Sequence, residues 1–132
     1  MKYLLDTHTW IWWNMHPQKL SAKVRSLIAT PAQYDELLLS AISLWEFAKL
    51  LEKQRLGISC APEEWMREAL EMPKLRIVQL SPAIACRSTI LPQPFHGDPA
   101  DQIIVATARE ENATLLTIDE KIRAYPHCRS LW

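Results

Sequence analysis

The sequence predicts an α/β protein with a central, mainly parallel sheet of four to five strands and helices on both faces. Short apolar runs alternate with helical patterns along the whole chain, which has no internal repeat. Strands joined by helices pair in parallel through right-handed crossovers, so both faces of the sheet are expected to be covered. A length of 132 residues and a hydrophobic content of 48% suffice for one buried core, so residues 1–132 are expected to form a single domain.

In residues 1–57, apolar runs and helix-start signals follow one another closely. The predicted elements are a strand at 2–5, a helix that starts at Asp6-Thr7, a helix from Ser21 to the residue before Pro31, a strand at 37–40 and a helix from Ser43 to about Arg55. Asp and Ser are favoured N-caps because their side-chain oxygens accept hydrogen bonds from the free N–H groups of the first turn. Gly57 ends the last of these helices.

Residues 58–132 continue the alternation. The predicted elements are a helix from Pro62 to Leu70, a strand at 76–80, a helix that starts at Ser81-Pro82, a helix from Asp98-Pro99 to about Asn112, a strand at 114–118 and a short helical turn at Asp119. Proline suits a first helical position, where its missing N–H would have no helical partner. The loop 92–97 precedes the long helix, and residues 129–132 are expected to add a weak edge strand.

Composition limits the partners and the compartment. The 15 basic residues balance the 15 acidic ones, so any anionic ligand must be attracted by a local patch or a metal. Neither a signal peptide nor a membrane-spanning run is present, which predicts a cytoplasmic protein. The three widely spaced cysteines, Cys60, Cys86 and Cys128, are interpreted as reduced packing residues.

Acidic residues occur where predicted strands end or helices begin, at Asp6, Glu46, Asp98 with Asp101, and Asp119. Ligands bind at the carboxyl ends of parallel strands, so several of these acids are expected to share one site. Two carboxylates ~4 Å apart repel each other by roughly 4 kcal/mol at an effective dielectric constant near 20, and a cation is needed to offset this. Oxygen ligands suit Mg²⁺ or Mn²⁺, whereas zinc would usually recruit Cys or His.

Each acid also has an ordinary structural explanation. Asp6 and Asp119 are suitable N-caps, and residues 98–101 place a cap, a proline and an acid where they favour a helix start. Glu46 shares a helix face with Lys49 and could form an exposed ion pair.

Two other enzyme classes are disfavoured. A phosphatase of the haloacid-dehalogenase type would need a second acid at position 8, which is His8. Gly57 and Gly97 are the only glycines, so neither a P-loop nor a dinucleotide-binding fingerprint is present.

Four motifs, each with an acid, lie in order along nearly the whole chain: YLLDTHTWIWW, SAISLWEFAKLLEKQRL, LPQPFHGDPADQIIVATA and TLLTIDEKI. Together they resemble the PIN-domain ribonucleases, and among these the VapC toxins of prokaryotic toxin–antitoxin pairs. The resemblance implies a three-layer α/β/α fold, a Mg²⁺- or Mn²⁺-dependent endoribonuclease, a small antitoxin that blocks it, and a homodimer.

The resemblance implies four acidic metal ligands, which at the matching positions are Asp6, Glu46, Asp101 and Asp119. Asp98 either assists these acids or only caps the helix, and Thr117 resembles a hydroxyl that lines the site. A metal held there would stabilise charge on the transferring phosphoryl group and lower the pKa of bound water. One-ion and two-ion mechanisms both remain open.

Tryptophan is abundant near the acids, at Trp10, Trp12, Trp13 and Trp45. Burial in the core is the default for such side chains. Positions 12 and 13 lie about 100° apart on a helix, so at least one is expected to face a groove. In the resembled family an antitoxin tail lies along such a groove, and Trp12, Trp13 and Trp45 are its expected contacts.

Basic residues follow Glu46 at Lys49, Lys53 and Arg55. Lys49 and Lys53 are expected to line the path of the substrate, and a solvated helix face is the alternative. His8 and His96 flank the acidic motifs without the spacing of a zinc or nucleophilic site, and are interpreted as local hydrogen-bonding residues.

Two positions depart from the pattern of the resembled family. Gln102 stands where an arginine commonly follows DPAD, and Gln54 stands where a glycine commonly precedes RL. The missing arginine removes a phosphate contact or an ion pair and leaves the acids intact. The alternative to an enzyme is a catalytically silent PIN-like module that binds RNA or a protein, and the presence of all the acids argues against it.

Overall fold

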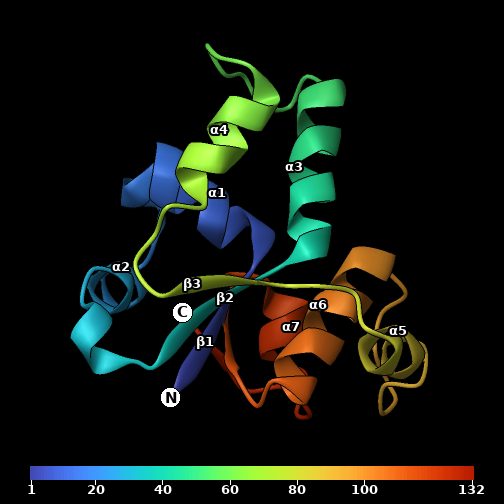
Figure 1. Cartoon of the computed structure of the whole chain (residues 1–132). Helices are drawn as coiled ribbons and strands as arrows, with labels where there is room; N and C mark the ends of the chain where they lie inside the picture. The colour runs from blue at the N-terminus through green and yellow to red at the C-terminus, as the bar shows by residue number, and fades with distance from the viewer.

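Five parallel strands form the central sheet of the computed structural model, which describes all residues from 1 to 132 (Figure 1). The strands are β1 (Lys2–Leu5), β2 (Glu36–Ser40), β3 (Leu75–Val78), β4 (Thr114–Leu116) and β5 (Ser130–Leu131). Their order across the sheet is β3-β2-β1-β4-β5. The predicted α/β class and the mainly parallel sheet are confirmed, including the weak edge strand at the end of the chain.

Seven α-helices connect or follow these strands: α1 (Thr7–Met15), α2 (Ala22–Ile28), α3 (Ala41–Glu52), α4 (Pro62–Ala69), α5 (Pro82–Ser88), α6 (Pro99–Glu110) and α7 (Glu120–Arg123). Two short 3₁₀ turns, Pro17–Lys19 and Pro31–Gln33, were not predicted. None of the helices combines the length and the apolarity that crossing a lipid bilayer requires.

The two faces of the sheet belong to two separate apolar clusters, because successive side chains of a strand point to opposite faces. On one face, Leu4 of β1 packs with Ile104 of α6 and Ile122 of α7. On the other face, Leu5 packs with Trp10 of α1. Figure 1 shows α5, α6 and α7 on one side of the sheet and α1 and α2 on the other, which confirms the three-layer α/β/α arrangement.

The N-cap of α3 is Ser40, and the prediction of Ser43 as the cap is wrong. Ser40 pairs with Val78 as the last residue of β2, and its side chain accepts a hydrogen bond from the N–H of Ile42 at 3.3 Å. The chain therefore turns from strand to helix without a loop. Ser43 is fully buried, where its hydroxyl contacts that of Thr7.

Two helices end earlier than predicted, and each is followed by a residue with left-handed backbone conformation. Helix α3 ends at Glu52, and Gln54 has a φ of 57°. Helix α6 ends at Glu110, and Asn112 has a φ of 53°. Asparagine tolerates this conformation, whereas glutamine does so at a cost. The strain at Gln54 gives a physical reason for the glycine that the family resemblance predicts at this position.

Two strand boundaries also differ from the prediction. Strand β3 covers residues 75–78 and not 76–80, and β4 ends at Leu116, two residues before the predicted end. The prediction placed both ends too late because the apolar runs continue past the strands, as far as Leu80 and Ile118. Both of these side chains are exposed and lie beyond the paired residues.

All three cysteines are free thiols, as predicted. Only Cys128 is buried, so the interpretation of Cys60 and Cys86 as packing residues is wrong.

Replacing Gln54 by glycine is expected to stabilise the fold. A left-handed conformation costs a residue other than glycine about 1 to 2 kcal/mol, which the substitution removes. Part of this stabilisation is offset because glycine raises the conformational entropy of the unfolded chain. The expected increase in the free energy of unfolding is about 0.5 to 1 kcal/mol in urea titrations. The neighbouring Lys53→Gly is the control, because Lys53 has a φ of −83° and should lose stability on the same change.

Candidate functional site

Asp6 lies directly after β1, between the ends of two strands. Its N–H donates to the carbonyl oxygen of Leu116 in β4 at 3.1 Å, and Thr117 Oγ1 donates to Asp6 Oδ2 at 2.6 Å. Its other oxygen, Oδ1, accepts from the N–H of Thr7 at 2.9 Å, so Asp6 also caps α1. Burial raises the pKa of this carboxyl above its usual range, although the Thr117 hydroxyl favours the charged form.

Glu46 lies on α3 and faces the start of α1. Thr7 Oγ1 donates to Glu46 Oε1 at 2.5 Å and is itself 2.8 Å from Ser43 Oγ. Burial, followed by repulsion from neighbouring acids, raises the pKa of Glu46 from 4.5 to about 7. Lys49 pairs with Glu52 at 2.8 Å, so the structural alternative of a Glu46–Lys49 ion pair is wrong.

Asp98 and Asp101 lie at the start of α6 and differ in their surroundings. Asp98 is exposed and caps the helix, since its Oδ1 accepts from the N–H of Asp101 at 3.0 Å. Asp101 is partly buried, and its Oδ2 lies 2.7 Å from His96 Nε2. Burial raises the pKa of Asp101 even though the His96 contact lowers it. His96 therefore forms the local hydrogen bond expected of it.

Asp119 is the N-cap of α7. Its Oδ1 accepts from the N–H groups of Lys121 and Ile122 at 2.8 and 3.1 Å, and its own N–H donates to Thr117 Oγ1 at 3.0 Å. Capping thus accounts for one oxygen of this acid. Its charge still raises the pKa of Asp6 and of Asp101, so Asp119 belongs to the same electrostatic neighbourhood.

The acids influence one another without forming a closed cluster. The charges of Asp6, Asp98 and Asp101 all raise the pKa of Glu46. However, no group of three or more Asp, Glu, His or Cys side chains is close enough to hold a metal ion. Hydroxyl or imidazole groups occupy one oxygen each of Asp6, Glu46 and Asp101. The donor chemistry therefore fits a hard divalent ion, and binding one would require these side chains to turn toward each other.

A cavity of about 380 Å³ opens beside Glu46 and Asp98. Basic residues line its other parts, namely Lys49, Lys53 and Arg55. Lys49 and Lys53, which were expected to line the path of a substrate, thus share a cavity with Glu46, and Lys49 is also paired with Glu52.

A second cavity, of about 500 Å³, adjoins the first one and shares His8, Leu50 and Arg55 with it. We call the two together the α1–α3 groove. Trp45 lines the first cavity and Trp12 the second, as expected for a groove.

Two expectations for this region do not match the structure. Trp13 lines neither cavity and packs against the core cluster beneath α1. His8 has no side-chain hydrogen bond, so its interpretation as a hydrogen-bonding residue is wrong; its ring lies 5.6 Å from that of Trp12.

Sequence reasoning missed Thr7 and Ser43 as parts of the site. Their hydroxyls connect α1 to α3 and fix one oxygen of Glu46. A signal was available, because Thr7 directly follows an acid and Ser43 precedes Glu46 by three residues, on the same helix face.

Comparison with known protein families supplies the deciding observation. The family model of the PIN domain matches residues 3–127. The chain belongs to the PIN-domain family. Among the relatives of this PIN domain is Ribonuclease VapC22 of Mycobacterium tuberculosis, which is 37% identical over 126 residues, covering 96% of this chain and 93% of the relative.

Solved structures with the same fold come from toxin–antitoxin complexes. VapBC2 of Rickettsia felis, bound to a promoter DNA fragment, matches the PIN domain with a TM-score of 0.72 and 20% identity over 100% of this chain and 99% of the other. A toxin–antitoxin complex of Klebsiella pneumoniae matches with a TM-score of 0.68 and 23% identity over 98% and 96%. At these identities the two structures establish the fold alone.

Glu46→Gln is expected to stabilise the metal-free PIN domain at pH 8 and to have little effect near pH 5. Folded Glu46 keeps its proton up to about pH 7, whereas the unfolded side chain loses it near 4.5. The folded state therefore binds more protons in this window, and its stability falls as the pH rises through it. With allowance for solvent screening, the gain at pH 8 is about 1 to 2 kcal/mol.

The measurement is urea unfolding in EDTA at both pH values. Glu63→Gln, at an exposed position in the first turn of α4, is the matched control and should show no such pH dependence. A gain that is equal at pH 5 and pH 8 would contradict the assignment of the effect to Glu46 ionisation.

Proposed function

We propose that this PIN domain, comprising residues 1–132, is a metal-dependent endoribonuclease toxin. It hydrolyses phosphodiester bonds of RNA at its acidic site and is inhibited by a small cognate antitoxin. The observation that carries the proposal is that partly buried acids from three separated segments, Asp6 after β1, Glu46 on α3 and Asp101 on α6, lie close enough for the charge of Asp6 to raise the pKa of the other two. The 37% identity to a protein named as a ribonuclease supports the reaction class.

The proposed ligands of Mg²⁺ or Mn²⁺ are Asp6, Glu46, Asp101 and Asp119. When bound, such an ion supplies a nucleophilic water of lowered pKa and stabilises negative charge on the phosphoryl and leaving oxygens. The chain's own residues position the acids: Thr117 holds Asp6, and Thr7 holds Glu46. Asp98 caps α6 and adds negative charge near Glu46.

Substrate and antitoxin are proposed to meet at the α1–α3 groove. Lys49 and Lys53, which line it near Glu46, would attract phosphates of RNA. Trp12 and Trp45 offer aromatic surface to an antitoxin segment lying in the groove, with Trp13 contributing packing beneath it. The fold relatives in toxin–antitoxin complexes support such a partner. The active form is proposed to be a cytoplasmic homodimer.

A catalytically silent module that binds RNA or a protein is the second candidate. The observation that favours it is the lack of any preformed group of three metal-ligating side chains. The chemistry of the acids disfavours it, because a binding module gains nothing from partly buried carboxylates that repel one another.

The two candidates are separated by RNA cleavage. Purified, antitoxin-free protein is incubated with a mixed cellular RNA pool in Mg²⁺ or Mn²⁺, and new RNA ends are sequenced. Discrete cuts are expected that disappear in EDTA. Asp6→Asn and Asp101→Asn should each lower the cleavage rate by roughly 100-fold or more, because each removes negative charge that would hold the ion.

Asp35→Asn is the matched control for these variants. Asp35 is an exposed carboxylate that pairs with the amino terminus and lies outside the acidic site, so its loss should leave cleavage unchanged. If folded wild-type protein with Mg²⁺ or Mn²⁺ makes no cuts, the enzyme proposal fails and the binding module takes its place.

The groove assignment is tested with the co-expressed antitoxin. Trp45 is 55% exposed, so Trp45→Ala should keep the fold and RNA cleavage. Removal of an aromatic interface residue typically costs ~2 kcal/mol, so roughly 30-fold more antitoxin should be needed to inhibit cleavage. Ile90→Ala, at a residue that is 73% exposed and outside the groove, is the control. Equal inhibition of all three proteins would place the antitoxin elsewhere.

A further inference from the structure

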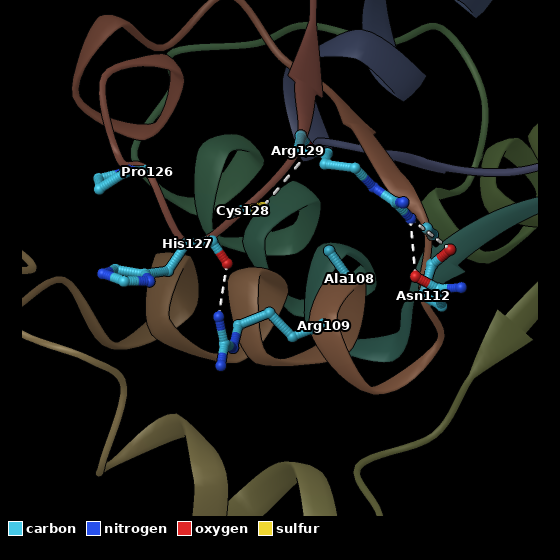
Figure 2. Close-up of a pocket in the computed structure, with 8 residues that line it drawn as sticks. Ala108, Arg109, Asn112, Pro126, His127, Cys128 and Arg129 are labelled. Atoms are coloured by element: carbon cyan, nitrogen blue, oxygen red, sulfur yellow. Dashed lines mark hydrogen bonds between the residues drawn. The ribbon is translucent and has the colours of Figure 1, made fainter.

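Two more cavities lie outside the α1–α3 groove and adjoin each other at Pro126. The first, of about 500 Å³, is lined by Phe95, His96, Lys121 and Tyr125. The second, of about 390 Å³, is lined by Arg109, His127 and Arg129 and is shown in Figure 2. Pro126 borders both cavities, so they form one continuous surface, which we call the Phe95–Arg129 surface.

The first cavity begins at the acidic site. His96 lines it and at the same time lies 2.7 Å from Asp101, through Nε2 and Oδ2. The ring of Phe95 lies 4.3 Å from that of His96 and 4.8 Å from that of Tyr125, between ring centroids. Tyr125 is buried, and its hydroxyl donates to the carbonyl oxygen of Pro92 at 2.6 Å. These contacts hold the partly exposed rings of Phe95 and His96 in place as aromatic walls beside Asp101.

Such walls suit a nucleobase. Every base presents a π-face that stacks on aromatic rings, and this stacking does not depend on which base is present. Lys121, an exposed residue, lines the same cavity and adds a positive charge to it. No carboxylate lines the cavity, so nothing in it repels a nucleotide directly.

The second cavity holds two arginines in fixed positions with uncharged partners. Arg109 Nη1 donates to the carbonyl oxygen of His127 at 2.5 Å. Arg129 Nη2 donates to the carbonyl oxygen and to Oδ1 of Asn112, both at 2.8 Å. Figure 2 shows the Arg109 side chain on the side of His127 and the Arg129 side chain on the side of Asn112.

The charges of these arginines are not neutralised. No carboxylate lines the second cavity, whereas Arg76 pairs with Glu36 and Arg87 with Glu110 elsewhere on the surface. A guanidinium has five N–H donors, and the bonds to carbonyl groups leave most of them free. Arginines held in this way are suited to phosphate, which they can bind in a bidentate manner.

The buried thiol of Cys128 does not offset this positive charge. It lies at the floor of the second cavity, and burial raises its pKa to about 11, so the thiol is neutral at physiological pH. The cavity is therefore neither a thiolate nor a metal site, and anion binding is the chemistry that its residues support.

We propose that the Phe95–Arg129 surface binds the RNA strand on one side of the cleaved bond, with a base in the aromatic cavity and separate phosphates at Arg109 and at Arg129. This inference rests on the proposed ribonuclease function and adds a substrate-binding surface to it. Since the chain has no net charge, attraction of RNA depends on local patches of this kind. The arginines also support carbonyl groups after α6, and the experiments separate this structural role from binding.

The first experiment measures RNA binding in the non-cleaving Asp6→Asn background. The probe is a fluorescein-labelled, mixed-sequence single-stranded RNA of about ten nucleotides, titrated at several salt concentrations. Adding Arg109→Gln with Arg129→Gln should weaken binding roughly ten-fold. Two lost phosphate contacts should also lower the slope of log K against log salt by about 1.4.

The matched control adds Arg25→Gln with Arg67→Gln, which removes the same charge from exposed positions on α2 and α4. This control should change binding less than about two-fold, because counterion release requires a phosphate contact. Equal effects of the two double variants, or no effect of either, would overturn the proposal. Melting temperatures of all proteins report whether the arginines act only on the fold.

The second experiment tests the aromatic cavity in the cleaving protein. Phe95→Leu keeps an apolar side chain and removes the ring. With Mn²⁺, kcat/KM for the RNA should fall roughly ten-fold, while kcat/KM for the same RNA with abasic sites in place of its bases, which has no ring to stack, should change less than about two-fold. Equal losses on both substrates would show that Phe95 only supports the acidic site. No loss on RNA would show that no base binds in this cavity.

Failure of this inference is distinct from failure of the proposed function. A wild-type protein that hydrolyses neither substrate with Mg²⁺ or Mn²⁺ refutes the nuclease, and the binding experiment still decides whether RNA uses the surface. A protein that cuts RNA normally after the arginine and Phe95 changes remains a nuclease and binds its substrate elsewhere.

Discussion

Burial of the Asp6 carboxylate at the end of the central strand costs free energy, and its neighbours lower that cost. The strand edge supplies the carbonyl of Leu116, which accepts the backbone N–H of Asp6, and the hydroxyl of Thr117, which donates to its side chain. The start of α1 supplies one further N–H. These partners reduce the desolvation penalty without removing it, so the pKa of Asp6 stays raised. Hydrogen bonds of one residue, Asp6, thus connect β1 with the end of β4 and the start of α1.

The aromatic core of α1, α3 and α4 places the second acid relative to the first. Phe47 stacks on Trp65 with ring centroids 4.1 Å apart, and Trp10 packs edge-on against both. Because Phe47 faces this core, its neighbour Glu46 is directed toward Thr7 and the acids. No buried side-chain nitrogen or oxygen lacks a hydrogen-bond partner, so the polar site and the apolar core meet without an unsatisfied group. Packing of Phe47 on one face of α3 therefore fixes the position of the Glu46 carboxylate on the neighbouring face.

The alternation of apolar runs and helix signals was enough to predict the parallel sheet, because buried strands and caps are local in sequence. The positions of Asp6 and Asp119 were predictable for the same reason, since each lies just past a strand and directly before a helix. Features that depend on tertiary contacts were not. Both Ser40 and Ser43 are suitable caps, and only pairing of β2 with β3 selects Ser40. Whether Glu46 would pair with Lys49 or with Thr7 depends on where α1 packs, which no pattern within α3 reveals.

The order of the strands also governs when the acidic site comes into existence. Strands β1, β2 and β3 lie side by side in the order β3-β2-β1, and β4 pairs with the free side of β1. Asp6 and Glu46 are made early, whereas Asp101 and Asp119 belong to the last third of the chain. A nascent chain therefore lacks the residues that complete the site until Asp119 has been synthesised. For the proposed ribonuclease, the site therefore cannot assemble on a nascent chain before β4 pairs with β1.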